Sequence, residues 1–535
     1  MKSLSVAVLL FASLLRLHAQ PANDRVAGRV VSSLDQRPIA HATVSLLDLS
    51  PGGKPLMTIS TDDGDFNFLA VPRGKYRLMG AATGYLTQPY QSHEGLFTAI
   101  VTGAGLPTDA LVLQIDPAST ISGHIVDEAG DPVQRAQLNL YREISGRITR
   151  IRSGAADTAG EYNFDRLAPG SYFLAVTATP WYAVHPRIDQ LNEVPQYRVA
   201  VDPSLDVAYP LTFYPRALDS DGAAPIVLKG GNQITADMQL SPTPAMSLSL
   251  RTPPGSPASQ RLPIVTRSVF GSDEQVPIQT TENINGTTRI PGFAPGRYKV
   301  TEFTQDGRFQ TGSDTADLTT GSVAMELGGN ADLANLSITI HGANGESLPA
   351  HMQIIFRNPD SNSFAQALTS DKDTLEVHNV PAGSYRLNLN GGAHPWNVMT
   401  LSVKGKPVPD KLLRIAAGGN VPIDLTISSS TSTIDGIARR NGKPADGSMV
   451  VLVPAGGDTS EGLFRRDQSN LDGGFTFSNV APGNYLVVAI DDSWSLRWND
   501  PTALTPYLIH AVPISIPSTG PSTIHLAEPL SAQPR

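Results

Sequence analysis

The segment Val71-Pro72-Arg73-Gly74-Lys75-Tyr76 is the first copy of a motif that occurs five times in the chain. Each copy has an apolar residue, a turn that contains Pro and Gly, one variable residue and a Tyr. The other copies are Leu167-Ala168-Pro169-Gly170-Ser171-Tyr172, Phe293-Ala294-Pro295-Gly296-Arg297-Tyr298, Val380-Pro381-Ala382-Gly383-Ser384-Tyr385 and Val480-Ala481-Pro482-Gly483-Asn484-Tyr485. The spacing from one Tyr to the next runs from 87 to 126 residues, which is the size of one sandwich domain.

The motif predicts a turn that begins a strand. Pro presets φ at the first corner of a turn, and Gly accepts backbone conformations that other residues avoid. The residues after the turn alternate in polarity, as in Tyr76-Arg77-Leu78, which is typical of a half-buried strand. A second hairpin signal precedes the motif, as Asp63-Gly64-Asp65-Phe66 in the first repeat and Asp472-Gly473-Gly474-Phe475 in the last.

Each repeat also opens with a strand, a polar turn and a second strand. In the first repeat, Val26 to Val31 leads through Gln36-Arg37-Pro38-Ile39 to a strand over 42–46. Each repeat yields about seven short strands, and no long stretch has the apolar spacing of a helix. We therefore predict an all-β chain of five tandem immunoglobulin-like or transthyretin-like antiparallel β-sandwiches.

The positions of the five motif Tyr residues, one in each repeat, give the expected domain boundaries. These lie near residues 117, 243, 331 and 430. Segments such as Ser241-Pro242-Thr243-Pro244 are expected to be linkers. The predicted organisation is a signal peptide over 1–19 and β-sandwiches over 20–117, 118–243, 244–331, 332–429 and 430–535.

The order of strand, G-x-P turn, A-x-V strand, D-G-x-F hairpin and P-G-x-Y strand resembles the carboxypeptidase regulatory-like domain. That domain is a transthyretin-like sandwich with a carbohydrate-binding-like fold, often grouped with collagen-adhesin B-type sandwiches. The match is closest in repeats one, two and five, and it covers nearly the whole mature chain. The resemblance implies a structural or binding module that accompanies metallocarboxypeptidases and is not itself the peptidase.

The first 19 residues have the layout of a secretory signal peptide. Lys2 supplies a positive charge, residues 4–15 are almost wholly apolar, and Ala19 stands at the expected cleavage point. The apolar run is shorter than the roughly 20 residues that a spanning helix needs. We therefore expect export to the periplasm or the extracellular space, and a mature chain that begins at Gln20 and has no membrane span.

The amino-acid composition limits the classes of partner and of catalytic chemistry that the protein can have. The chain has no Cys, which removes thiol catalysis and thiolate metal sites. Its formal charge of −9 argues against a nucleic-acid partner, because binding a polyanion needs clustered Lys and Arg. The expected partner is an envelope protein or a polysaccharide.

Catalytic and metal-binding motifs are weak or missing. His525-Leu526-Ala527-Glu528 has the His-to-Glu spacing of a metallocarboxypeptidase, but no downstream His follows it. The H-E-x-x-H and G-x-S-x-G motifs are absent. Asp62-Asp63-Gly64-Asp65 and Asp219-Ser220-Asp221-Gly222 could offer oxygen ligands to Ca²⁺, yet turns also favour Asp-Gly. We expect no catalytic residue, no metal and no cofactor.

One segment is a candidate ligand site. Residues 491–500 follow the last motif strand, read as a polar loop, and hold two of the chain's four Trp residues. Trp494 and Trp498 could stack on a sugar while Arg497 and Asp492 bind its hydroxyls. The indoles could instead cap the domain core or contact a protein. Trp181-Tyr182, at the matching point of the second repeat, favours the packing alternative.

Three functions follow from these observations, in decreasing order of support. The first is a non-catalytic exported multi-domain protein that binds or spaces a partner outside the cytoplasm. The second is a carbohydrate-binding protein that uses loop aromatics, and retention on insoluble polysaccharide would distinguish it from the first. The remote third is a metallocarboxypeptidase-related hydrolase.

Collagen-adhesin B-type sandwiches can carry a Lys–Asn isopeptide bond whose Lys lies on the first strand. The candidate first strands of this chain contain no Lys. They are Val26 to Val31, Ile121 to Val126, Met246 to Leu250, Leu336 to Ile340 and Ile434 to Ala438. The resemblance to that group therefore stops at the fold.

The intact mass of the mature chain should therefore equal the mass of its sequence from Gln20, apart from cyclisation of that Gln. High-resolution mass spectrometry of the exported protein measures this directly. A deficit of one ammonia molecule per domain would reveal isopeptide bonds and contradict the prediction.

Overall fold

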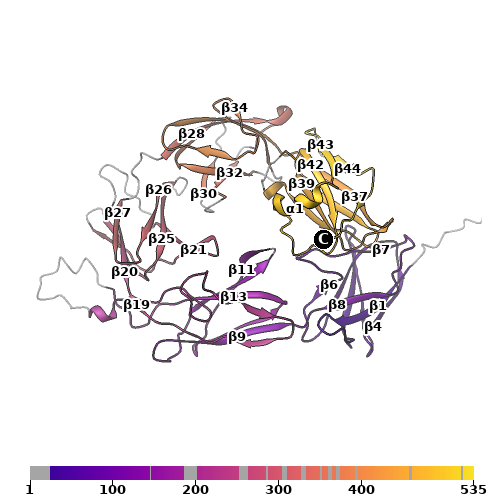
Figure 1. The fold of residues 1–535 in the computed structure, drawn as a ribbon, viewed down its shortest axis with the longest axis horizontal. Helices are drawn as coiled ribbons and strands as arrows, with labels where there is room; N and C mark the ends of the chain where they lie inside the picture. Colours follow the sequence, from indigo (N-terminus) through magenta and orange to yellow (C-terminus); the bar gives the residue numbers. More distant parts are fainter. Residues whose placement is uncertain are drawn as a thin grey trace, which may run out of the picture. The chain divides into compact units, whose positions relative to one another are not determined.

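The computed structural model describes residues 24–144, 146–185, 202–251, 263–284, 287–303, 310–326, 333–349, 352–359, 364–368, 374–391, 396–456, 461–519 and 522–535. The expected signal peptide and the expected boundary near residue 331 lie outside these ranges. Regular structure in the described chain is almost entirely β-strand, and a short helix, α1 (Pro501–Leu508), lies near the C-terminus (Figure 1). None of the described helices is long and apolar enough to cross a membrane.

The chain separates into two compact units, of which the first holds β1 to β8. One of its sheets has the strand order β4-β1-β8, and the other has the order β3-β2-β5-β6, with β7 also paired to β5. The strands are β1 (Asp24–Ser32), β2 (Thr43–Asp48), β3 (Pro55–Ile59), β4 (Asp65–Val71), β5 (Gly74–Ala81), β6 (Gln88–Pro89), β7 (Ile100–Thr102) and β8 (Leu111–Ile115).

The second unit begins with two sheets of residues 119–240. One has the order β12-β9-β17, with β18 also on β9, and the other has the order β11-β10-β13-β15, with β16 also on β13. The strands are β9 (Ser119–Val126), β10 (Gln137–Ile144), β11 (Arg147–Ala155), β12 (Glu161–Leu167), β13 (Gly170–Thr177), β14 (Val207–Ala208), β15 (Thr212–Phe213), β16 (Ile226–Leu228), β17 (Gln233–Thr235) and β18 (Met238–Gln239).

Residues 246–326 form sheets of order β23-β24-β20-β27 and β22-β21-β25-β26. A two-stranded ladder, β14-β19, precedes them along the chain. The strands are β19 (Thr243–Pro244), β20 (Met246–Arg251), β21 (Ile264–Val269), β22 (Ser272–Gln275), β23 (Glu282–Ile284), β24 (Thr287–Phe293), β25 (Arg297–Phe303), β26 (Gln310–Asp317) and β27 (Val323–Glu326).

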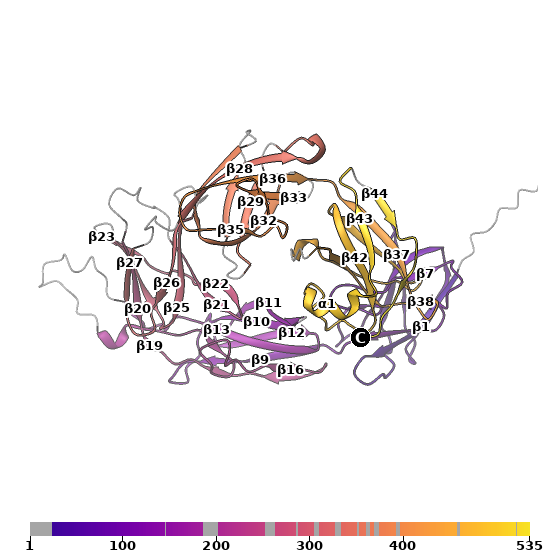
Figure 2. The same ribbon diagram turned by 45° about the horizontal axis from the view of Figure 1, so that its top comes forward.

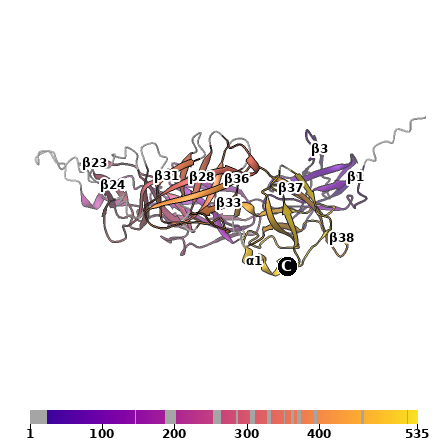
Figure 3. The same cartoon turned by 90° about the horizontal axis from the view of Figure 1, so that it is seen from above.

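Residues 333–428 form sheets of order β31-β28-β36-β33-β34 and β30-β29-β32-β35. Figure 3 labels β31, β28, β36 and β33 of the first sheet. The strands are β28 (Leu333–Gly342), β29 (Gln353–Arg357), β30 (Phe364–Leu368), β31 (Thr374–Pro381), β32 (Gly383–Asn390), β33 (Asn397–Val403), β34 (Lys406–Pro407), β35 (Leu413–Ile415) and β36 (Asn420–Ser428).

The last part of the chain, residues 432–531, is called here the C-terminal sandwich. One sheet has the order β38-β37-β41, with β44 and β45 also on β37, and the other has the order β40-β39-β42-β43. The strands are β37 (Ser432–Arg440), β38 (Lys443–Pro444), β39 (Met449–Pro454), β40 (Arg465–Gln468), β41 (Gly474–Val480), β42 (Gly483–Ile490), β43 (Val512–Ile516), β44 (Ser522–His525) and β45 (Leu530–Ser531).

Paired sheets share one apolar core, which makes each pair a sandwich. In residues 119–240, Ile121 of β9 and Phe164 of β12 belong to the same buried cluster as Leu138 of β10 and Tyr172 of β13. The alternation of buried and exposed residues along β4 and β8 shows the period of two that one-sided burial requires. The predicted all-β sandwich fold is confirmed, and the chain is a multi-domain protein; its division into five domains stays a prediction.

The sheets are mainly antiparallel, as predicted, but each first strand also has a parallel partner that the sequence did not reveal. The pairs join the first strand of a sandwich to its last strands. They are β1 with β8, β9 with β17 and β18, β20 with β27, β28 with β36, and β37 with β44 and β45. Parallel neighbours need a long connection, and here the connection is the rest of the sandwich.

The motif Tyr residues occupy equivalent buried positions. Their exposed fractions lie between 1% and 5%. The hydroxyl groups of four of them donate to the carbonyl oxygen four residues upstream: Tyr76 to Pro72 at 3.0 Å, Tyr172 to Ala168 at 2.6 Å, Tyr298 to Ala294 at 2.7 Å, and Tyr485 to Ala481 at 2.9 Å. Each ring therefore fills the core while its hydroxyl fixes the turn at the start of its own strand.

Burial further favours the protonated form of three of these hydroxyl groups. It raises the pKa of Tyr76 and Tyr172, and raises that of Tyr385 to about 12. A buried phenol disfavours its charged form because the surrounding dielectric is low. The hydroxyls therefore remain hydrogen-bond donors at any ordinary pH.

The D-G-x-F hairpin and the G-x-P turn meet at one residue of the first strand. In the first sandwich the Val30 amide donates to the Gly64 carbonyl at 2.8 Å, and the Ile39 amide donates to the Val30 carbonyl at 3.0 Å. Ala438 makes the same pair of bonds in the C-terminal sandwich, with Gly473 and Ala445. Gly473 has φ of 76°, and a Cβ there would lie 2.3 Å from the Ala438 carbonyl oxygen, so only Gly fits.

The predicted linker at residues 241–244 is not free. Thr243–Pro244 forms β19, which pairs antiparallel with β14, and the Ala245 amide donates to the Asp206 carbonyl at 2.8 Å. The segment is therefore held by backbone hydrogen bonds to a neighbouring loop, and its role as a linker between two domains stays a prediction.

Replacement of Tyr485 should separate the role of its ring from that of its hydroxyl. Tyr485→Phe loses one net hydrogen bond, about 1 kcal/mol, whereas Tyr485→Ala also empties the core and costs about 3–5 kcal/mol. Urea unfolding of the full chain measures both losses of stability. Trp181 and Trp396 are replaced by Phe, so that the fluorescence comes from Trp494 and Trp498 alone. A loss below about 1 kcal/mol for Tyr485→Ala would show that the ring is peripheral.

Candidate functional site

The predicted ligand segment, residues 491–500, follows β42 directly. Its first residue, Asp491, is held in place by hydrogen bonds to its carboxylate. Asp491 is 8% exposed, and it accepts hydrogen bonds from Arg440 Nε at 2.5 Å and from Arg440 Nη2 at 2.8 Å. The Ser448 hydroxyl donates to the same carboxylate. This fork of charge-assisted bonds fixes the start of the segment on the C-terminal sandwich.

Trp494 and Trp498 pack partly buried against the outer face of the β39–β42 sheet. They contact a cluster that includes Met449, Val451 and Val488, and Leu504 of α1 closes the same cluster. Figure 2 shows α1 lying against β42. Every residue of β39 is buried, because one face of the strand packs into the sandwich core and the other packs under this cover.

Arg466 covers the two indoles. Its guanidinium carbon lies 5.7 Å from the ring centroid of Trp494 and 4.8 Å from that of Trp498. These distances are within the range of cation–π attraction, which is strongest for Trp. One indole face of each Trp is thus in contact with the protein. The two indoles are packed against protein groups, an arrangement closer to a packed layer than to an open surface on which a sugar could stack.

The two polar members of the candidate site are exposed. Asp492 has φ of 47° at a turn, and Arg497 lies 3.8 Å from Asp500 in a surface ion pair. The structure therefore brings the four predicted residues into one segment, with the indoles on the sandwich and the charged groups in solvent. The assignment of this segment as a ligand site stays a prediction.

Helix α1 was not expected, although its start is marked in the sequence. The Asp500 side chain accepts from the Thr502 amide at 2.9 Å as an N-cap, and Pro501 occupies the first turn. Asp followed by Pro is a helix-start signal. The continuous apolar run Met449–Val453 was a second signal, because a strand buried on both faces needs a cover over its outer face.

The second repeat does not reproduce this feature. Trp181 is 86% exposed and meets Tyr182 edge-on, with 5.7 Å between the ring centroids. The Tyr182 hydroxyl donates to Glu128. The expected equivalence of Trp181-Tyr182 with the Trp494 segment is therefore wrong, because Trp181 covers no core.

The residues considered for metal or catalytic roles have structural partners. His525 Nδ1 lies 2.5 Å from an Asp435 carboxylate oxygen, on the neighbouring parallel strand. Asp65 pairs with Arg29 at 2.8 Å, and Asp219 accepts from the Gly222 amide at 2.7 Å within its own turn. In the described part of the chain, no group of three or more His, Asp or Glu side chains could hold a metal ion.

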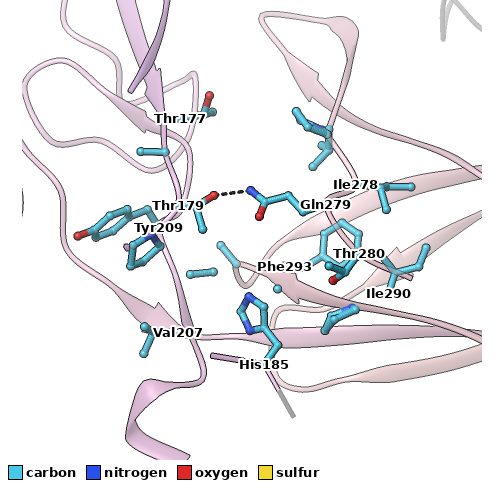
Figure 4. Close-up of a pocket in the computed structure, with 18 of the residues that line it drawn as sticks. Thr177, Thr179, His185, Val207, Tyr209, Ile278, Gln279, Thr280, Ile290 and Phe293 are labelled. Atoms are coloured by element: carbon cyan, nitrogen blue, oxygen red, sulfur yellow. Dashed lines mark hydrogen bonds between the residues drawn. The ribbon is translucent and has the colours of Figure 1, made fainter. Parts of the chain in front are cut away.

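A cavity of about 330 Å³ lies in the second unit and was missed by the sequence analysis. Its walls come from the sandwich of residues 119–240 and from that of residues 246–326. Thr179 and Tyr209 line one wall, and Gln279 and Phe293 line the other, with a hydrogen bond from the Gln279 amide to the Thr179 hydroxyl (Figure 4). Its volume falls within the range of small-molecule sites.

Comparison with known proteins identifies one part of the chain. Residues 25–101 match the family model of the carboxypeptidase regulatory-like domain. No curated protein matches the chain. Similar solved structures include the Bacillus anthracis TIE protein, with 8% identity over 96% of this chain and 76% of that chain and a TM-score of 0.18. They also include a streptococcal ancillary pilin, with 10% identity over 52% and 98% and a TM-score of 0.18.

A third similar structure is GBS52, the minor pilin of Streptococcus agalactiae, with 11% identity over 41% of this chain and 96% of that chain and a TM-score of 0.21. TM-scores this low carry no argument about function. The paired sheets and their shared apolar cores make this a multi-domain β-sandwich protein. The match of residues 25–101 to the carboxypeptidase regulatory-like domain agrees with the resemblance seen in the sequence.

Acid should weaken the C-terminal sandwich through Asp491. Burial alone would raise the pKa of this carboxyl, but hydrogen bonds from Arg440 and Ser448 outweigh burial and hold the pKa below its usual value. A depressed folded-state pKa adds stability above the unfolded pKa of about 3.9, and that stability is lost as the pH falls through the folded value.

We therefore expect the free energy of unfolding, followed by Trp494 and Trp498 fluorescence, to fall as the pH drops below about 4. Asp491→Asn should be less stable at pH 7 and should flatten this acid dependence. If the free energy of unfolding falls equally at low pH in the variant and in the parent, other carboxylates cause the effect.

Trp494→Ala and Trp498→Ala should each destabilise the cover of the β39–β42 sheet, by about 2–4 kcal/mol for a partly buried indole. Trp181→Ala is the matched control and should change stability by less than about 0.5 kcal/mol. Hydrogen exchange of the β39 and β42 amides in the full chain measures the effect. Unchanged exchange together with lost ligand retention would favour the sugar-site interpretation.

Proposed function

We propose that this protein is an exported, non-catalytic array of β-sandwich domains that binds or spaces an envelope partner outside the cytoplasm. One observation carries the proposal: the repeated polar residues are used to build the sandwich. The Tyr hydroxyls hold turns, and the Asp-Gly turns hold the first strands. Side chains that serve the same structural bond in repeat after repeat are not free to do chemistry.

Export is supported by the N-terminal layout, with Lys2, the apolar stretch 4–15 and Ala19. The absence of Cys does not argue against export, because a sandwich of this size buries enough apolar surface without disulfides. The carboxypeptidase regulatory-like domain at residues 25–101 supports a binding or structural role in place of a peptidase.

A carbohydrate-binding protein is the second candidate, and Trp181 is the observation that favours it. Its indole is 86% exposed and is held in place by the edge of Tyr182, which the Glu128 carboxylate anchors in turn. Large rigid aromatic faces in solvent suit sugar rings and protein partners alike. Trp494 and Trp498 fit this role less well, because Arg466 lies over them.

Sedimentation with insoluble polysaccharide distinguishes the two functions. The mature chain should stay in the supernatant with cellulose, chitin or xylan and should pellet with isolated cell envelopes. Trypsin treatment of the envelopes should abolish that pelleting if the partner is a protein. Pelleting with a polysaccharide that is lost in Trp181→Ala, and kept in Trp494→Ala, would replace the first function with the second.

A further inference from the structure

The cavity between the sandwich of residues 119–240 and that of residues 246–326 is walled mainly by apolar groups. Tyr209, Ile290 and Phe293 are buried and line it, whereas Thr179 and Gln279 at its rim are exposed. Figure 4 shows the Tyr209 and Phe293 rings on opposite walls. Such a lining favours a ligand with an apolar body and a small number of polar groups.

The charge of the lining is entirely positive. Arg135 and Arg267 line the cavity, and no Asp or Glu is among the described residues that do so. His185, which also lines the cavity, has its Nδ1 2.7 Å from an Asp206 carboxylate oxygen, so Asp206 is the partner of this imidazole. Arg135 is exposed to solvent. The desolvated charge at the cavity is therefore that of Arg267, which the Glu274 carboxylate attracts from outside the cavity lining.

Arg267 is a cation held on an apolar strand face. On β21 it stands between Val265 and Val269, which are 0% and 1% exposed, and residues two apart share a face of a strand. Its Nε is buried and has no hydrogen-bond partner in the described chain. Burial lowers the pKa of this guanidinium, because the charged form loses its water.

The nearest carboxylate across the ladder is used elsewhere. Glu274 is the strand partner of Arg267 in β22. However, the Tyr141 hydroxyl donates to the two oxygens of Glu274 at 2.8 and 2.9 Å, and Arg150 lies 3.8 Å from one of them. Glu274 attracts Arg267 electrostatically, but the two side chains form no direct ion pair within the described residues. A buried guanidinium without a direct ion-pair partner is costly, and the carboxylate of a ligand could supply that partner.

We propose that this cavity binds a small organic carboxylate with an apolar ring, and that Arg267 is the anchor for the carboxylate. The planar guanidinium suits a carboxylate because it can donate two parallel hydrogen bonds. Tyr209 and Phe293 then enclose the ring, and the Thr179–Gln279 hydrogen bond closes one side of the cavity. This assignment is independent of the partner proposed above, since it concerns a cavity that takes a small molecule.

Benzoate is the probe, and its binding to the full mature chain is measured by ligand-observed NMR titration. We expect a Kd on the order of 1 mM, which is reasonable for so small a ligand. Benzamide, which has the same shape but no charge, should bind at least roughly tenfold more weakly because it cannot neutralise Arg267. Inorganic phosphate and galacturonate, which lack an apolar body, should also bind more weakly than benzoate.

Arg267→Gln should weaken benzoate binding at least roughly tenfold while leaving benzamide unchanged. Arg297→Gln is the matched control and should bind as the parent does, because Arg297 is a surface residue paired with Asp317 in the same sandwich. Thr280→Trp, which fills the rim from an exposed position, should also abolish binding and tests the cavity without removing a buried charge.

Four results would overturn the proposal. They are no benzoate binding at 50 mM (roughly fifty times the expected Kd), equal affinity for benzoate and benzamide, tighter binding of galacturonate than of benzoate, and parent-like benzoate affinity in a folded Arg267→Gln or Thr280→Trp. Tighter galacturonate binding would reassign the cavity to an acidic sugar.

Discussion

Each sandwich depends on a buried Tyr whose ring packs in the core, and most of these Tyr hydroxyls bond to their own chain. In four of the repeats, the hydroxyl of a core Tyr reaches the carbonyl oxygen four residues upstream, across the Pro-Gly turn. The ring packs in the core, and its hydroxyl binds the turn that precedes it. These two contacts fix the register of the strand that begins at the turn. The adjoining strands then align on it, as β10 does along β13 and β39 does along β42.

The local part of this arrangement was readable in the sequence. The motifs predicted the strands, the buried Tyr residues and the all-β sandwich, because turn chemistry and alternation of polarity act over a few residues. The first strands also lie where predicted, for example β37 over Ser432–Arg440. The Trp494 segment was predicted as one polar loop, and the structure places its residues in one segment next to α1.

The remaining features depend on contacts between residues far apart in the chain. The parallel closure of each first strand, the cover of β39 by α1 and the cavity around Arg267 all join such residues. Hints were present locally, such as the unbroken apolar run at β39 and a lone Arg between two Val on β21. Such a local pattern indicates that a strand face is covered or that a charge is enclosed. It does not identify the residues that cover the face or surround the charge.

The parallel pairing of the first and last strands has a mechanical consequence. Because the two strands run in the same direction, the chain enters each sandwich at one end and leaves it at the other. Tension applied through the chain ends pulls these neighbours in opposite directions along their length, as in β28 and β36 with their eight paired residues. All the ladder hydrogen bonds are then loaded together in shear, and none can be peeled away one at a time. A sandwich with this strand pairing should therefore resist extension through its chain ends.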